Sequence, residues 1–128
     1  MAGEAIKVFN NGNLSRDFTY IDDIIEGVVR VIDHAPQSDC NHPVPAEIYN
    51  IGCGSPMQLM DFIAELERAL GRKAIMQMMP MQQGDVYTTY ADTSKLERDF
   101  GYRPHVTLAE GIVHFAEWYT TINKELNL

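Results

Sequence analysis

An aromatic residue and an arginine lie on either side of one polar cluster near the N-terminus. Phe9 precedes the run Asn10-Asn11-Gly12-Asn13, whose composition predicts a turn, and Arg16 follows it. A flat aromatic face can pack on a nucleobase, and a guanidinium donates forked hydrogen bonds to phosphate oxygens. The pair therefore indicates a site for a base and a phosphate. The alternative is an exposed corner in which Arg16 contacts Asp17.

The elements expected around this pair are a strand, a turn, a second strand and a helix. Residues 6–9 begin with apolar and polar side chains in alternation, and residues 16–21 contain the Phe, Thr, Tyr and Ile that favour strands. Asp22 and Asp23 then open a helix whose apolar residues recur at helical spacing as far as Ile32. Arg16 is thus predicted at a turn-to-strand corner that an anion can reach.

Two further groups could carry chemistry, but each has a simpler structural explanation. Asp22 and Asp23 could act as an acid–base pair, although helix capping is the commoner role of aspartate at such a junction. Gly52-Cys53-Gly54 follows a predicted strand, as a dinucleotide-binding loop would, but Met57 replaces the third glycine and Arg72 replaces the later acidic residue. A tight turn explains these glycines.

Histidine and cysteine residues cluster in the sequence without the spacing of a metal site. The cluster has no Cys-x-x-Cys or His-x-x-x-His pair, and most of it falls in a proline-rich loop at residues 35–46. No metal site is therefore predicted. The residues of the cluster are His34, Cys40, His42 and Cys53.

The remaining pattern predicts a mixed α/β fold with short strands and about four helices. Gly71 and Gly101 are expected to end helices, and Thr107 with Glu110 forms a capping box at the start of the last one. The predicted elements are strands at 47–51 and 74–79, an extended segment at 86–91, and helices at 59–70, 93–99 and from 108 to about 122.

Composition limits the class of protein. The 128 residues suit one domain, and 45% hydrophobic with 22% charged residues is an ordinary globular balance. A net charge of −8 opposes binding to nucleic acid. No run approaches the roughly 20 apolar residues of a membrane span, and the N-terminus has no signal-peptide pattern. With two cysteines and no export signal, we expect reduced thiols in a cytoplasmic protein.

Four ordered motifs resemble the C-terminal, substrate-binding part of the extended short-chain dehydrogenase/reductase family. The turn NNGNLSRDFTYIDD and the segment PMQQGDV are most similar to its UDP-glucuronate 4-epimerase branch. The likeness covers nearly all of residues 1–128, as one nucleotide-sugar-binding domain. The other motifs are YNIGCGSPMQLMDFI, the run from Met81 to Pro104 and the helix from Leu108 to Tyr119.

The resemblance implies a role for four residues. Phe9 matches an aromatic that packs on uracil, and Arg16 matches an arginine that contacts the pyrophosphate. Asp85 matches an acidic residue near the ribose hydroxyls and phosphate contacts. Gln82 occupies the place of a second phosphate-binding arginine in galactose-type epimerases, so phosphate affinity would depend more on Arg16.

The resemblance also implies chemistry that this chain lacks the groups to perform alone. In the family, bound NAD oxidises the sugar at C4 and returns the hydride to the other face, using a Rossmann half with a Tyr-x-x-x-Lys pair. That pair and the Rossmann half are absent here, so no catalytic residue and no NAD binding are predicted for this chain.

Two further expectations follow from the missing half. Helix faces that would pack on it should be apolar and exposed, which predicts a homo-oligomer. The alternatives to an epimerase function are the substrate domain of a nucleotide-sugar dehydratase or decarboxylase, and a non-catalytic binding or oligomerisation module.

Overall fold

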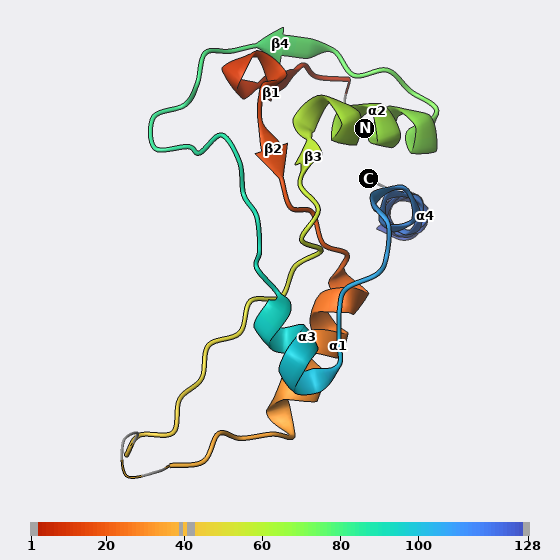
Figure 1. Cartoon of the computed structure of the whole chain (residues 1–128). Helices are drawn as coiled ribbons and strands as arrows, with labels where there is room; N and C mark the ends of the chain where they lie inside the picture. The colour runs from red at the N-terminus through yellow and green to blue at the C-terminus, as the bar shows by residue number, and fades with distance from the viewer. Residues whose placement is uncertain (1–2, 39, 41–42, 127–128) are drawn as a thin grey trace.

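The computed structural model describes residues 3–38, 40 and 43–126, and it contains short strands and four α-helices. Figure 1 shows the strands and α2 at one end of the molecule and α1 with α3 at the other. The mixed α/β fold expected from the sequence is therefore confirmed. The elements are β1 (Ile6–Val8), η1 (Phe9–Gly12), β2 (Ser15–Arg16), α1 (Ile21–Ile32), β3 (Met57–Gln58), α2 (Leu59–Leu70), β4 (Met76–Met78), α3 (Ser94–Phe100) and α4 (Leu108–Leu126).

The strands form two small sheets that join distant parts of the chain. β1 pairs in parallel with β4, with Ile6 opposite Met76, and β2 pairs antiparallel with β3, with Arg16 opposite Met57. Between β1 and β2 the chain turns through η1, where Asn10 and Asn11 adopt φ angles of 48° and 50°. Asparagine tolerates this left-handed region, so the predicted turn is confirmed.

The strands predicted at 16–21, 47–51 and 74–79 are shorter than expected or absent, with the last limited to Met76–Met78. The strand expected at 16–21 is limited to Ser15 and Arg16, because its partner β3 consists only of Met57 and Gln58. Residues 47–51 are not a strand, and residues 86–91 contribute only an isolated bridge between Thr88 and Ser15. β propensity alone does not make a strand, since each backbone needs a hydrogen-bonding partner.

The helix ends follow the sequence signals closely. Gly71 and Gly101 end α2 and α3 with φ angles of 62° and 60°, a conformation that glycine adopts without steric cost. At α4 the Glu110 N–H donates to Thr107 Oγ1 at 3.3 Å, and the Thr107 N–H donates to the Glu110 carboxylate at 2.9 Å. Both predicted caps and the predicted capping box are confirmed.

A small core joins α2 to α4 and to the chain before α1. The rings of Phe18 and Phe62 stack with their centroids 4.1 Å apart. The buried apolar side chains are Val8, Leu14, Ile63, Leu96, Tyr102, Ile112 and Ala116.

No helix within the described residues combines the length and hydropathy needed to cross a bilayer.

Asp23 lies in the first turn of α1, as predicted, but its carboxylate does not cap that helix. It is 2% exposed and accepts hydrogen bonds from the N–H groups of His105 and Val106, at 3.0 and 2.8 Å, and from the Tyr102 hydroxyl at 3.1 Å. The expectation of capping was wrong for this side chain, because its carboxylate accepts hydrogen bonds from the segment before α4 instead. Asp23 therefore ties α1 to that segment.

Candidate functional site

Arg16 is held in place by three acceptors at the end of β2. Its Nη1 donates to the carbonyl oxygens of Ser15, at 2.8 Å, and Tyr87, at 3.3 Å. Its Nη2 donates to Asp85 Oδ1 at 2.6 Å. A guanidinium has five N–H groups, so the Nε–H and one Nη2–H have no partner among the described residues. Arg16 is thus oriented by the protein and keeps donors for an anion.

Asp85 belongs to a tight turn that also contains Gln82. The Asp85 N–H donates to the Gln82 carbonyl oxygen at 3.2 Å, and Asp85 Oδ1 accepts the Val86 N–H at 2.8 Å. The Arg16 and Asp85 side chains are 23% and 30% exposed, so the ion pair lies on an accessible surface. The structure therefore joins Arg16 to Asp85 and places Gln82 in the same turn.

Main-chain hydrogen bonds bring β2 and residues 79–89 together. The Ser15 N–H donates to the Tyr87 carbonyl oxygen at 2.8 Å, and the Thr89 N–H donates to the Ser15 carbonyl oxygen at 3.1 Å. Farther up the chain, the Asn11 N–H donates to the Met79 carbonyl oxygen at 3.0 Å. These bonds fix the turn before β2 against the segment that carries Gln82 and Asp85.

Phe9 lies in η1 rather than on the first strand, which ends at Val8. Its side chain is partly buried and, among the described residues, makes no ring contact with Arg16 or Asp85. The main chain nevertheless brings η1 against Met79, six residues before Asp85. The expectation that Phe9 and Arg16 occupy adjacent strands was therefore wrong, although both flank the same turn.

Asp17 was missed as a positioning residue by the sequence interpretation. Its Oδ2 accepts the N–H groups of Gly54 and Ala91 at 3.0 Å each, and its Oδ1 accepts the Ser55 N–H at 3.3 Å. The alternative in which Arg16 contacts Asp17 is thus replaced by an Arg16–Asp85 pair. A single aspartate next to an arginine gives no sequence signal for partners so far away.

The loop at Gly52-Cys53-Gly54 has the geometry of a close turn rather than of a phosphate cradle. A Cβ on Gly52 would lie 2.5 Å from the Ala91 Cβ, and Gly54 has a φ of +63°. The Gly54 N–H, which a phosphate would need, already donates to the Asp17 carboxylate. These residues do not fit a dinucleotide, and the explanation by a tight turn is supported.

The histidines and cysteines do not assemble a metal centre in the part of the chain that the structure describes. No three His, Cys, Asp or Glu side chains there lie close enough to hold an ion. Cys40 is exposed, Cys53 is partly buried, and burial raises the pKa of the Cys53 thiol. His42 lies outside the described residues.

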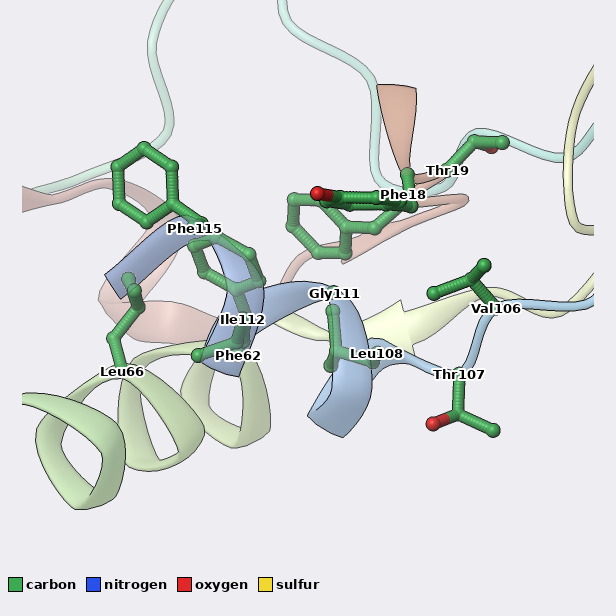
Figure 2. Close-up of a pocket in the computed structure, with 11 residues that line it drawn as sticks. Phe18, Thr19, Phe62, Leu66, Val106, Thr107, Leu108, Gly111, Ile112 and Phe115 are labelled. Atoms are coloured by element: carbon green, nitrogen blue, oxygen red, sulfur yellow. The ribbon is translucent and has the colours of Figure 1, made fainter. Parts of the chain in front are cut away.

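A separate apolar pocket of about 300 Å³ lies between α2, α4 and the chain before α1. Figure 2 shows aromatic and aliphatic side chains around it, and Arg16, Asp85, Phe9 and Gln82 are not among its lining residues. No charged side chain lines it, so it offers nothing to hold a diphosphate. Its lining includes Phe18, Tyr20, Phe62, Leu66, Ile112 and Phe115.

Comparison with protein-family models gives a match over residues 2–115 to the family described as GDP-mannose 4,6 dehydratase. The chain belongs to the extended short-chain dehydrogenase/reductase family. The resemblance seen in the four sequence motifs is thereby confirmed.

Similar proteins include several that are named UDP-sugar 4-epimerases. A probable UDP-glucuronate 4-epimerase of Rhizobium meliloti is 42% identical over 129 residues, which cover 91% of this chain and 38% of that protein. The structure of Bacillus cereus UDP-glucuronic acid 4-epimerase with UDP-glucuronic acid and NAD matches at 29% identity with a TM-score of 0.77, over 93% of this chain and 36% of that one. The Bifidobacterium longum UDP-glucose 4-epimerase with NAD⁺ and UDP gives 26% and 0.80, over 92% and 35%.

The chain therefore spans between 35% and 38% of the length of these three relatives. The structures named above contain NAD, whereas the Gly52–Gly54 loop of this chain does not fit a dinucleotide. The match is thus to one part of each of these proteins.

Proposed function

We propose that this chain is the nucleotide-sugar-binding part of an NAD-dependent UDP-sugar 4-epimerase that interconverts UDP-glucuronate and UDP-galacturonate. The proposal is supported by family membership and by the named activity of the relatives. In this proposal the protein acts in carbohydrate metabolism in the cytoplasm.

The pair formed by Arg16 and Asp85 is the observation that carries this proposal. The two residues are 69 positions apart in the sequence, yet their side chains meet at 2.6 Å, and the resemblance assigns the diphosphate to Arg16 and the ribose to Asp85. The free Nε–H and Nη2–H of Arg16 would donate to phosphate oxygens, and Asp85 would accept from ribose hydroxyls. Its negative charge would also keep Arg16 in position.

Phe9 and Gln82 complete the proposed site at its two ends. The Phe9 ring would pack on the uracil, and the Gln82 amide would donate to a phosphate oxygen without adding charge. With no second cation at position 82, Arg16 would provide most of the phosphate affinity. Arg16 and Asp85 are 23% and 30% exposed, and in this proposal the NAD-binding half supplies the other wall of the site.

Ligand titration of the isolated chain tests the site. We expect weak, saturable binding of UDP and UDP-glucuronate by calorimetry, reduced at least about tenfold in Arg16→Ala because a charge-assisted phosphate contact is lost. Arg103→Ala is the matched control, since it removes the same charge from an exposed residue of the loop before α4. Absence of binding to wild type would reject the nucleotide site and leave the non-catalytic oligomerisation module.

An activity assay tests whether epimerisation needs redox groups that lie outside this chain. The isolated chain should show no epimerisation in the presence of NAD, because the proposed redox groups lie outside it. Turnover by the purified 128-residue chain would contradict this assignment.

A dehydratase is the second candidate, favoured by the description of the matching family model. Both enzyme classes would bind the nucleotide with the same residues. The product that the full-length protein forms therefore distinguishes an epimerase from a dehydratase. A sugar product isomeric with the substrate supports the epimerase, and a product lacking one water supports the dehydratase.

A further inference from the structure

The ribbon formed by β1 and β4 has one apolar side and one polar side. Its register places Ile6 opposite Met76 and Val8 opposite Met78. Because side chains alternate along a strand, these four residues share one side of the ribbon, and the polar residues between them lie on the other side. Val8 is 1% exposed, so the apolar side is the one that faces the core.

The two methionines on this apolar side are exposed to solvent. Met76 is 36% exposed and Met78 is 48% exposed, although they lie on the same side of the ribbon as the buried Val8. They are therefore the methionines most accessible to a reagent in solution within the part of the chain that the structure describes. The other described methionines are partly buried, and they are Met57, Met60, Met79 and Met81.

An accessible thioether is a nucleophile toward peroxides. The sulfur attacks the terminal oxygen of a hydroperoxide, the O–O bond breaks, and the proton of that oxygen passes to the leaving alkoxide, which departs as an alcohol. The sulfur is oxidised by two electrons to a sulfoxide, and the hydroperoxide is reduced by two. The sulfoxide is polar, and methionine sulfoxide reductases convert it back to the thioether. Oxidation therefore makes an apolar side chain polar, and the change is reversible.

The strand that carries these methionines leads directly into the contacts that hold η1. Figure 1 shows β4 beside β1 and η1 at the end of the molecule that carries α2. The Met79 N–H donates to the Val8 carbonyl oxygen at 2.9 Å, and the Asn11 N–H donates to the Met79 carbonyl oxygen at 3.0 Å. A two-stranded ribbon this short has little stability of its own, and apolar cross-strand neighbours contribute to its pairing. A polar sulfoxide beside Val8 would therefore weaken the pairing of β1 with β4 and loosen η1.

We propose that Met76 and Met78 are a site of reversible oxidation by hydroperoxides, and that sulfoxide formation at this site loosens η1. The exposure of the two side chains, their register beside Val8 and the contacts of Met79 support this assignment. The turn η1 also carries Phe9. Weaker UDP binding after oxidation is a second consequence, and it rests on the proposed function.

Peptide mapping by mass spectrometry tests the oxidation site. The 128-residue chain is treated with tert-butyl hydroperoxide and then with dithiothreitol, which reverses cysteine sulfenic acid and disulfide formation but leaves sulfoxides in place. We expect Met76 and Met78 each to gain one oxygen atom at least about fivefold faster than Met57 or Met60, because they are more exposed. Equal rates at the four positions would overturn the proposal.

Hydrogen exchange tests the effect on the turn. Exchange of the amides of residues 9–12 should become at least about fivefold faster after oxidation, and methionine sulfoxide reductases should restore the original rate. The double variant Met76→Leu with Met78→Leu keeps the side-chain volume without sulfur, so its exchange should not respond to the oxidant. Met57→Leu is the matched control, since it removes a thioether from the other small sheet, and its exchange should still respond. Met78→Gln places a polar side chain beside Val8 and should speed exchange without any oxidant.

Two results of the exchange experiment would reject the proposal. Sulfoxide at Met76 and Met78 with unchanged exchange at residues 9–12 would show that the turn does not depend on these side chains. A response that persists in the double leucine variant would assign the effect to another residue. UDP titration before and after oxidation is a separate readout. Failure of the untreated wild-type chain to bind UDP rejects the nucleotide site of the proposed function, whereas the exchange result still decides on the oxidation site.

Discussion

The corner at Arg16 and Asp17 and the outward side of α1 differ in how their side chains are satisfied. At the corner, two neighbouring residues make ion-pair and hydrogen-bond contacts with residues 52–55 and 85–91 inside the same chain. On α1, the apolar stripe from Ile21 to Ile32 contacts solvent. The corner thus takes its geometry from partners within this chain, whereas the apolar side chains on the outer surface of α1 are exposed.

This difference indicates that the geometry of the proposed phosphate-binding site can be studied on the isolated chain. Polar groups that internal partners already hold need no further element to adopt their geometry. The proposed phosphate-binding site at Arg16 should therefore be preformed. An exposed apolar stripe gains most of its free energy only when covered. Stability should therefore depend on the internal aspartates and very little on the outer face of α1.

The largest expected effect comes from Asp23, which ties the inner side of α1 to the segment before α4. Asp23→Ala leaves the His105 and Val106 N–H groups without their acceptor, while the Tyr102 hydroxyl keeps the Asp23 carbonyl oxygen at 2.8 Å, and the loss should lower the free energy of unfolding by about 3 kcal/mol. Denaturant unfolding measures it, with the exposed Asp22→Ala as the matched control. Equal effects of the two substitutions would contradict the proposed tie.

Asp17 should matter less, because it is only partly buried. Asp17→Ala removes an acceptor from three backbone N–H groups that water can partly reach, so a loss of about 2 kcal/mol is expected. The same variant should weaken UDP binding through Arg16, which lies next to it on the chain. Unchanged stability together with unchanged binding would show that the corner does not need this carboxylate.

The sequence revealed features that depend on local chemistry. The left-handed turn at Asn10 and Asn11, the glycine ends of α2 and α3, and the Thr107–Glu110 box each involve residues within a few positions of one another. Such signals act through backbone conformation and nearby N–H groups, so they depend little on tertiary contacts.

Features that depend on distant partners could not be predicted from the pattern. The segment 47–51 has strand propensity, but no described strand pairs with it, so the strand predicted there is absent. The partners of Asp17 and Asp23 lie 37 to 83 positions away along the chain. Asp85 was named only through family resemblance, and its pairing with Arg16 required the structure. That the four named residues bind a nucleotide sugar stays a prediction.

Alkaline pH should probe the inner side of α1 through Tyr102. Burial, and next the hydrogen bond to Asp23, raise the pKa of Tyr102 from 10.0 to about 12. Because the folded-state value lies above the ordinary one, this stabilising contribution is complete below pH 10 and is lost as the pH rises through about 12. Melting temperature between pH 9 and about 12 should thus fall more steeply for wild type than for Tyr102→Phe. Parallel curves would contradict the burial of this hydroxyl.

The smallest effect is expected on the outward side of α1. Ile32 is 68% exposed, and isoleucine and serine have similar helix propensities, so Ile32→Ser should change the free energy of unfolding of the monomer by no more than about 0.5 kcal/mol. Denaturant unfolding at low protein concentration gives this value, and sedimentation at high concentration should show weaker self-association. A loss above about 2 kcal/mol would mean that Ile32 is packed in the monomer, since only burial makes an apolar truncation that costly. In that case the two regions would not differ in the way described.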